Sequence, residues 1–533
     1  MRLFAGAIGF GLALMIPCVG SATLFIPSAA FRQIYFSNSE TVAFRPTIAD
    51  GGTVTFGTSS PSRRLWRANP GGFAEVAVQT GQSTPSVGGG TLTIGTYGEM
   101  SRDGRLLFSS FIDNGTPITQ AIFRAGLGTA LAPQVTAPTA LEGAVDHTFV
   151  SFNGAAVRFG ANGSTAFPAT IRQGTSGPTR DALVRSAANV NRLVVAAGDP
   201  APGMPAGTVF HPQLRNSILH SVNGSGEVFF SALVVKPGNV ISGGIWRSND
   251  SGLSPVILWG EPIPGSTGGV FKGMDELRVN DRGDVVFRGG EEYPGGVSRQ
   301  GAWLRRADGF ITRAIDPAAA TPIPGTTPQP GQTAVVNGRG VVVGPVENRD
   351  AGGAFVGHSY ALRREDGTFV RLIQHRDVLP GVPPQHYVNN IFPPVLNVLG
   401  TTAFAYSEAD HMGGTDALAV YGIDGSLQFH VRPGDQVQTA VGQIRTVDRV
   451  GFAAINQQLP STVFSGVGGE DGWRTPLNAQ NQLVMTISFT DNSQGVYVVT
   501  IPEPFAGGAA AVLTCFGLLR RVPGLSGRRE RAE

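Results

Sequence analysis

Residues 280–287 read Asn280-Asp-Arg-Gly283-Asp-Val285-Val-Phe287 and combine a tight turn with the start of a strand. The Asn side chain bonds to its own backbone and Gly accepts a positive φ, so the pattern Asn-x-x-Gly favours a turn. The alternation Val-x-Phe that follows favours a strand with one buried face. How often this octapeptide recurs therefore decides the fold.

Eight copies of the octapeptide can be recognised, and the third is the most degenerate. They start at Ala49, Ser101, Phe152, Asn223, Asn280, Asn337, Asn397 and Asn478, so the intervals are 52, 51, 71, 57, 57, 60 and 81 residues. After each copy come a second strand that often ends in Arg, a Gly turn, a third strand and a Pro-Gly loop. Four short strands in about 60 residues match one blade of a β-propeller, and such units bury their faces only by stacking.

The sequence therefore predicts an all-β domain over residues 23–500, a propeller-like ring of eight four-stranded blades. Seven blades are the alternative, because the copy at Phe152 and the last interval are irregular. An open solenoid or a pair of β-sandwiches is the other possibility. The eighth unit stops at Ile501 without its last strand, and an extra strand at 31–36 precedes the first unit. We expect this N-terminal strand to complete the last blade.

The composition agrees with a turn-rich globular protein. Of 533 residues, 74 are Gly and 37 are Pro, which argues against a helical bundle. Apolar residues make up 41%, too many for a disordered chain. The net charge of +2 gives no reason to expect a nucleic-acid partner. The two cysteines, Cys18 and Cys515, lie in the terminal segments, so no disulfide framework is expected.

Residues 1–22 have the features of a secretory signal peptide. Arg2 precedes an apolar stretch at 3–19, and small residues follow up to Ala22. We expect signal peptidase to cleave after Ala22. An uncleaved membrane anchor is the alternative.

Residues 501–533 combine Pro502-Glu503-Pro504, an apolar segment at 505–519 and an Arg-rich tail that begins at Arg520. The apolar segment is short for a stable span, and the arginines favour a cytoplasmic end. The three parts, in this order, resemble the PEP-CTERM sorting signal of bacterial exported proteins. The resemblance implies transient membrane insertion through 505–519, followed by removal of the tail by an exosortase; retention of the tail as an anchor is the alternative. The body also resembles exported proteins with tandem Asn-x-x-Gly repeats.

Familiar catalytic motifs are missing from the sequence. It contains no Gly-x-Ser-x-Gly elbow, no phosphate-binding loop and no His-Glu-x-x-His, and its only lysines are Lys236 and Lys272. We therefore assign no catalytic residue from the sequence.

Three weaker features are candidates for a site. The first is the acidic residue at the Pro-Gly loops, found as Asp199, Glu261, Asp316, Asp377 and Asp435. Recurrence would place these carboxylates on one rim, where hard oxygen ligands suit Ca²⁺. The alternative is that each carboxylate accepts backbone N–H groups within its own turn.

The second candidate is the cluster of Glu408, Asp410 and His411, which could bind a metal or transfer protons; a solvated loop is the alternative. The third is the Arg that ends the second strand. This Arg recurs as Arg67, Arg124, Arg185, Arg247, Arg305 and Arg363. It could line a channel for anionic sugars or cover apolar surface with its stem.

These observations predict an exported, surface-sorted protein of the bacterial envelope or extracellular matrix. We expect a non-enzymatic structural or adhesive role, with polysaccharide or protein as the partner. The competing hypothesis is a secreted propeller hydrolase or lyase that acts on polysaccharide. No cofactor is expected apart from the Ca²⁺ that a carboxylate rim would suit.

Overall fold

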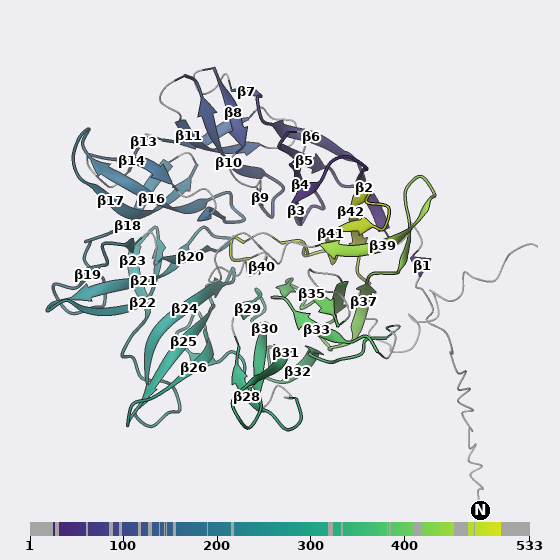
Figure 1. Cartoon of the computed structure of the whole chain (residues 1–533). Coiled ribbons are helices and arrows are strands. Elements are labelled where there is room, and N and C mark those ends of the chain that lie inside the picture. Colours follow the sequence, from purple (N-terminus) through teal and green to yellow (C-terminus); the bar gives the residue numbers. More distant parts are fainter. Residues whose placement is uncertain are drawn as a thin grey trace, which may run out of the picture.

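The computed structural model is an all-β ring of eight sheets (Figure 1). It describes residues 25–502 apart from 27–30, 60–61, 85–88, 95–98, 116–118, 126–130, 138, 143, 145, 153–155, 189, 215–217, 318–322, 332–333, 381, 383–384, 410–416, 452–466, 469 and 474. Ala22, Asp410, His411, Glu503, Pro504 and the segment 505–519 lie outside the described residues. Within the described part of the chain, no helix has the length and apolarity needed to cross a bilayer.

The first four blades follow one another along the chain. Blade 1 contains β3 (Val42–Ile48), β4 (Val54–Thr58), β5 (Arg64–Ala68) and β6 (Ala74–Gln79). Blade 2 contains β7 (Ser83–Thr84), β8 (Gly90–Ile94), β9 (Glu99–Met100), β10 (Leu106–Asp113), β11 (Thr119–Ala125) and β12 (Ala132–Thr136). Blade 3 contains β13 (Thr139–Ala140), β14 (His147–Phe152), β15 (Arg158–Phe159), β16 (Thr165–Gln173), β17 (Thr179–Ala187) and β18 (Val190–Ala196). Blade 4 contains β19 (Val209–Phe210), β20 (Leu219–Val222), β21 (Val228–Lys236), β22 (Val240–Asn249) and β23 (Gly252–Leu258).

The other four blades complete the ring. Blade 5 contains β24 (Val270–Val279), β25 (Val285–Tyr293), β26 (Val297–Arg305) and β27 (Ile311–Arg313). Blade 6 contains β28 (Thr327–Pro330), β29 (Val335–Val336), β30 (Val342–Arg349), β31 (Phe355–Arg363) and β32 (Phe369–Gln374). Blade 7 contains β33 (Val388–Ile391), β34 (Val395–Leu396), β35 (Thr402–Glu408), β36 (Ala417–Tyr421), β37 (Leu427–Val431) and β40 (Val467–Gly468). Blade 8 contains β1 (Phe25–Ile26), β38 (Gln436–Gln438), β39 (Ile444–Gly451), β41 (Gln482–Phe489), β42 (Gln494–Thr500) and β2 (Phe31–Ser37).

The Asn-x-x-Gly segments are turns, as the sequence predicts. The side-chain oxygen of Asn280 accepts the N–H groups of Arg282 and Asp284, and Gly283 takes a φ of +84°. Asn397 accepts the N–H groups two and four residues later in the same way. This local pattern ends the inner strand of the blade and starts the next one.

The same asparagines also join neighbouring blades. Each uses its side-chain N–H to reach the carbonyl oxygen of the matching residue in the next blade. The donor–acceptor distances are 2.7 Å for Asn280 to Asn337, 2.8 Å for Asn337 to Asn397, 3.0 Å for Asn397 to Asn478 and 2.9 Å for Asn478 to Ala49. These bonds link blades 5, 6, 7, 8 and 1, so the Asn both shapes its turn and sets the spacing of the ring.

The prediction that the third copy starts at Phe152 is wrong. Phe152 ends β14, and the turn of blade 3 is formed by residues 160–163, where Gly163 donates to the carbonyl of Gly160. The copy therefore runs from Gly160 to Phe167, with Gly in the place of Asn. With this correction, the third turn lies 59 residues after Ser101 and 63 before Asn223. The irregularity that favoured seven blades disappears.

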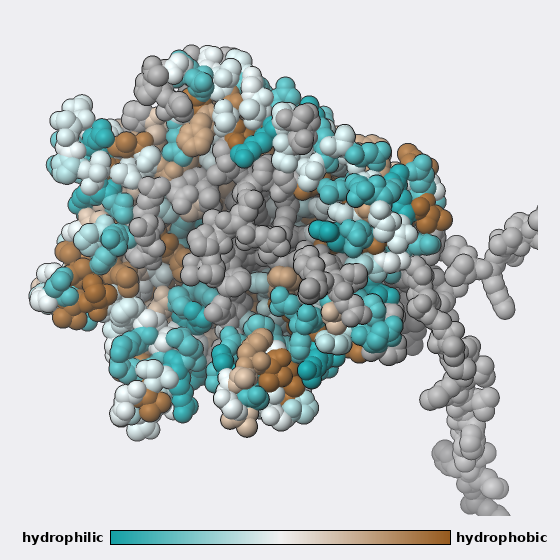
Figure 2. All heavy atoms as spheres, viewed as in Figure 1, coloured by the Kyte–Doolittle hydropathy of each residue, from teal (hydrophilic) through white to brown (hydrophobic). Residues whose placement is uncertain are grey.

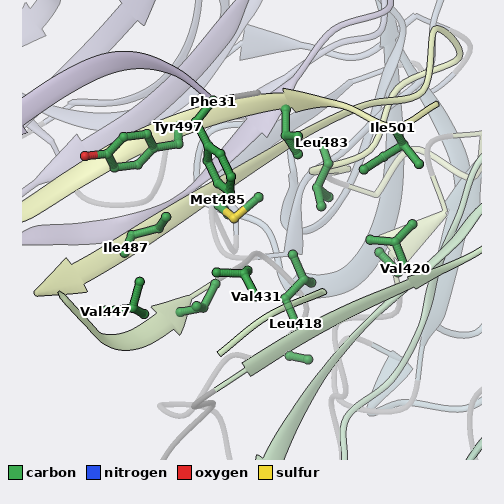
Figure 3. Close-up of a cluster of buried hydrophobic side chains, with 14 of the residues drawn as sticks. Phe31, Leu418, Val420, Val431, Val447, Leu483, Met485, Ile487, Tyr497 and Ile501 are labelled. Carbon is green, nitrogen blue, oxygen red and sulfur yellow. The ribbon is translucent and has the colours of Figure 1, made fainter. Parts of the chain in front are cut away.

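The core lies between the blades. Eight clusters of buried apolar side chains each join two successive blades, including one that joins blade 8 to blade 1 through Val484 and Phe56. Figure 3 shows the cluster between blades 7 and 8, where Leu418 and Val420 face Leu483 and Met485. The strand after each Asn turn is therefore buried on both faces rather than one; all five residues of β4 are buried. Eight interfaces for eight blades mean that the ring is closed, which confirms the predicted fold.

The N-terminal strand completes blade 8, as predicted. β2 pairs antiparallel with β42, from Phe31 opposite Val499 to Ser37 opposite Gln494. Phe31, Ile34 and Tyr35 are buried in the clusters on either side of this blade. The two ends of the domain thus share one sheet.

The two faces of the ring differ. The Asn turns lie on one face, called here the Asn-turn face, and the Pro-Gly loops lie on the opposite face, called the loop face. The described chain leaves β42 on the Asn-turn face, because the N–H of Ile501 bonds to the carbonyl of Asn481 (2.7 Å). β2 begins on the same face, since Phe31 is opposite Val499.

Candidate functional site

The centre of the ring is filled by the chain itself. Residues 467–475, called here the axial segment, leave blade 8 between β39 and β41 and cross the middle of the ring near β40 (Figure 1). β40 runs parallel to β34 of blade 7. The carbonyls of Gly472 and Asp471 accept the N–H groups of Phe159 in blade 3 and Val222 in blade 4. The carbonyl of Thr475 accepts the N–H of Ile48 in blade 1. The segment thus contacts four blades.

Two buried arginines hold the axial segment. The guanidinium carbons of Arg158 and Arg278 lie 3.6 and 4.1 Å from the ring centre of Trp473, so both make cation–π contacts with it. Arg278 also pairs with Asp471 at 3.5 Å, and both side chains are buried. Burial raises the pKa of Asp471 to about 7, although Arg278 acts in the opposite direction. This is a buried ion pair with an aromatic ring beside it.

A second polar group lies on the axis at the Asn-turn face. Arg102 of blade 2 bonds to Asp50 of blade 1 (2.9 Å) and to Asp281 of blade 5 (2.6 Å). Glu470 of the axial segment lies beside them, and burial raises its pKa. A cavity of about 10 Å³ borders Asp50, Arg102 and Glu470, which is the space that one water molecule needs. The acidic side chains here therefore fix blades across the axis.

The acidic residues of the Pro-Gly loops close their own turns. Each of four accepts the backbone N–H three residues before it, at 2.8 Å for Asp199, 2.9 Å for Glu261, 2.8 Å for Asp377 and 3.0 Å for Asp435. They belong to separate blade junctions and are not brought together, and Asp316 is exposed. Within the described ranges, no three His, Cys, Asp or Glu residues are placed to bind one metal ion. Ca²⁺ binding stays a prediction.

Glu408 lies in a buried polar cluster of blade 7. Its side chain is 1% exposed, and its Oε2 lies 3.0 Å from Nδ1 of His386 and 3.6 Å from Nη1 of Arg432. The hydroxyl of Tyr406 bonds to Nε2 of His430, and burial lowers the pKa of His430 to about 4. The sequence selected Glu408 but paired it with Asp410 and His411; His386 and Arg432 come from other strands' ends.

The largest cavity in the described part of the chain is in blade 5 and opens on the loop face. It measures about 570 Å³ and is lined by residues 263–266, Tyr293, Trp303 and 311–313. Under it lies Glu291, which accepts bonds from Arg313 (2.5 and 3.0 Å), Tyr293 (2.7 Å) and Trp303 (3.2 Å). Arg313 also covers the ring of Trp303 at 4.2 Å. The cavity thus offers aromatic walls and a guanidinium whose charge is already matched.

Glu291 and Glu408 occupy equivalent positions, eleven residues after the Asn of their own turns. Blades 2, 3, 4 and 8 bury an apolar side chain at this position, namely Ile112, Ile171, Val234 and Phe489. A buried carboxylate costs stability unless it is paired, so an acid at an otherwise apolar repeat position marks a functional candidate. Comparison of the repeats eleven residues after each Asn was the signal available in the sequence.

The recurring Arg of the second strands does not line the axis. Arg67 reaches the carbonyl of Gly104 in the next Asn turn (2.8 Å), and Arg185 bonds to Asp250. The axial arginines, Arg158 and Arg278, belong to the inner strands instead. The sequence analysis missed these two arginines, Asp471 and Trp473. The long last interval of 81 residues was the sign of an extra segment.

The structure defines a class of protein: a closed eight-bladed β-propeller, clasped by its N-terminal strand and crossed by its own axial segment. The chain belongs to a family of unknown function, DUF7453, whose model matches residues 31–315 and 211–507. A comparison with curated proteins gives no match.

Solved propeller structures resemble the chain at low identity. The β-propeller domain of the Trilobed protease from Pyrococcus furiosus has a TM-score of 0.37 and 9% identity, over 75% of this chain and 96% of that one. Polysaccharide lyase Uly1 has a TM-score of 0.35 and 11% identity, over 76% and 98%. The α-L-arabinanase of Penicillium chrysogenum, in complex with arabinobiose, has a TM-score of 0.27 and 13% identity, over 66% and 95%.

Proposed function

We propose that this protein is an exported propeller, displayed at the cell surface or in the extracellular matrix, that binds a matrix polymer at the blade 5 cavity without chemical turnover. The observation that carries the proposal is the cavity of about 570 Å³, walled by Tyr293 and Trp303 and open on the loop face. Ligand sites are concave and mostly apolar, with a few well-placed polar groups. Arg313 and the Tyr293 hydroxyl are such groups, held in place by Glu291.

The position of the termini supports a display role. Both ends of the described chain lie on the Asn-turn face, whereas the cavity opens on the loop face. A C-terminal anchor or sorting helix after Pro502 would therefore leave the cavity pointing away from the membrane. The axial segment supports binding at the blade rather than on the axis, because its contacts occupy the centre of the ring.

Tyr293→Ala tests this function. Large aromatic side chains at the centre of a binding site commonly account for about 2 kcal/mol or more of affinity, so we expect retention on immobilised matrix polymers to fall about tenfold or more. The measurement is biolayer interferometry of the purified protein against a panel of polysaccharides and host matrix protein. Phe73→Ala, at an exposed aromatic of blade 1, is the matched control and should bind like the wild type. Equal binding by wild type and Tyr293→Ala would refute the assignment.

The sorting step is a separate part of the proposal. In the native host, the double change Pro502→Ala and Glu503→Ala should leave the C-terminal tail attached, because an exosortase would no longer recognise the motif. Immunoblotting of membrane and released fractions measures the change in mass. Thr500→Ala is the control and should mature normally. A double variant that is trimmed and released like the wild type would contradict the sorting claim.

A second candidate function is cleavage of polysaccharide at the blade 7 cluster. It is favoured by the buried carboxylate of Glu408 beside His386, since a carboxylate that holds an imidazole is a common acid–base arrangement. The binding measurement distinguishes the two functions: release of fragments from an immobilised polysaccharide would favour this second function, and stable retention would favour the first.

A further inference from the structure

The third strand of blade 5 has an unpaired edge beside the cavity. β26 runs from Val297 to Arg305, but β27 pairs only with Trp303, Leu304 and Arg305. In the described residues, no strand lies beside 297–301 on the side away from β25. Residues 297–300 are all exposed. An exposed edge presents free N–H and C=O groups that can pair with another extended chain.

The direction of the free groups follows from the existing pairing. The carbonyl of Ala302 accepts the N–H of Ala314, so Ala302 faces the outer side of the sheet. Alternate residues of a strand direct their backbone groups to the same side. The N–H and C=O groups of Ser298 and Gln300 therefore point outward along the free edge.

The side chains of this edge define what could dock. Arg299, Gly301 and Trp303 share one face of β26, because side chains alternate along a strand. Trp303 lines the cavity, and a Cβ on Gly301 would lie within 2.5 Å of the Arg313 and Trp303 side chains and even closer to Glu291. Gly301 thus leaves the cavity wall open beside the edge. Arg299 is exposed at the same face, 5.6 Å from the Tyr293 ring.

We propose that this edge binds an extended polypeptide by strand addition, with an acidic side chain opposite Arg299 and an aromatic side chain, two residues away, in the blade 5 cavity. The proposal rests on the cavity of the proposed function and names its partner class. Main-chain bonds to an edge supply affinity in such complexes, and pockets for alternate side chains supply specificity. A spacing of two follows because only every second side chain faces the cavity.

Charge argues against a second copy of this chain as the occupant. Two β26 edges paired about their middle would place the two Arg299 guanidinium groups opposite each other, and like charges facing across strands are destabilising. The charge of Arg313 is matched by Glu291 and is not available to an acidic ligand. Arg299 is thus the cation that selects the partner.

On the face seen in Figure 2, apolar side chains gather over the outer ends of blades 4 and 6. The third strands of these blades also extend beyond their outer strands, and they expose Val240, Ile241 and Phe355. In blade 4, however, the N–H of Trp259 already occupies the carbonyl of Gly243 (3.0 Å). Blade 5 combines a free edge with a cavity, which is why the partner is assigned to it.

The test uses the purified protein and synthetic octapeptides in fluorescence anisotropy. The probe is Thr-Val-Glu-Thr-Trp-Thr-Val-Thr, together with the version in which Glu and Trp are exchanged. The control peptide spaces Glu and Trp by three residues, which places them on opposite faces. We expect the probe, in one of the two orders, to bind about tenfold more tightly than the control. N-methylation of the probe on one edge only should weaken binding by about tenfold or more, because the main-chain donors are lost.

Two kinds of variant complete the test. Ser298→Pro removes an outward N–H on an edge where Pro is tolerated, and should abolish binding. Arg299→Glu is at an exposed position and should reverse the preference, so that a Lys-x-Trp peptide binds and the Glu-x-Trp peptide does not. Equal binding of the two N-methylated forms, or no saturable binding of any probe, would overturn strand addition. If the probes fail while Tyr293→Ala still reduces polymer retention, the cavity function stands and the peptide assignment falls. Concentration-dependent dimers that Ser298→Pro removes would instead identify a second copy as the occupant, and would overturn it too.

Discussion

A chain that begins at Asn38, and so lacks β2, is expected not to form a stable monomer. The deletion removes Phe31, Ile34 and Tyr35 from two inter-blade clusters and leaves β42 as an open edge of blade 8. Burying one large apolar side chain contributes about 1.5–3 kcal/mol, so the three together approach the total stability of a typical domain, about 5–15 kcal/mol. We expect the melting midpoint to fall by more than 10 °C, or folding to fail, because unfolding entropy converts several kcal/mol into such a shift. Circular dichroism and size-exclusion chromatography measure both.

A chain that begins at Ala29 is the matched control. It loses β1, which pairs with β38 over two residues only, but keeps β2. We expect it to melt close to the full chain. A peptide covering 29–40, added to the chain that begins at Asn38, should restore part of the lost stability by filling the vacant edge. Equal melting of the two truncated chains would show that the clasp does not close the ring.

The sequence allows the architecture to be predicted because its signals are local. The Asn-x-x-Gly turn and the strand after it depend on neighbours only four residues away, as the bonds of Asn280 show. The clasp was predictable by counting, since one unit lacked a strand and one strand lacked a unit. The copy at Gly160 was missed because Gly replaces the Asn that identifies the motif. Gly keeps the turn there, but the bond to the next blade is lost.

The candidate sites were less predictable because they join distant segments. Asp471 and Arg278 are 193 positions apart in the chain and meet only because the axial segment crosses the ring. The blade 5 cavity depends on the missing side chain of Gly301 and on the early start of β27, neither of which has a sequence pattern. Glu408 was found by local clustering, but its partner His386 comes from the segment before β33. Side chains that converge through tertiary structure leave few local signals.

The second large effect is expected at the axial ion pair. Arg278→Met should destabilise the protein by about 3–5 kcal/mol at pH 8, because it leaves Asp471 charged and buried without its partner. Asp471 is 2% exposed, so water does not replace the lost contact. The free energy of unfolding from urea titration measures the change. Arg67→Met changes an arginine that is also buried but bonds to a backbone carbonyl, and is the matched control. It should cost less, because it leaves no charged partner behind.

The pH dependence of the same variants separates the charge of Asp471 from its packing. The pKa of Asp471 is about 7 in the folded protein and 3.8 in an unperturbed carboxyl, so between pH 4 and 7 the folded state holds a proton that the unfolded state has released. Stability from this group is therefore greatest at low pH and falls as pH rises through that window, by on the order of 4 kcal/mol. Arg278→Met should consequently cost less at pH 5, where Asp471 is neutral, than at pH 8. Asp471→Asn should remove this fall, and Arg278→Met with Asp471→Leu should recover most of the stability that Arg278→Met loses, since an apolar pair can replace a buried ion pair. Arg158 also faces Asp471, and Glu276 lies near Arg278; neither is changed in these variants, so their contributions cancel in the comparison. An equal cost of Arg278→Met at pH 5 and pH 8 would mean that the pair acts by packing around Trp473 rather than by charge.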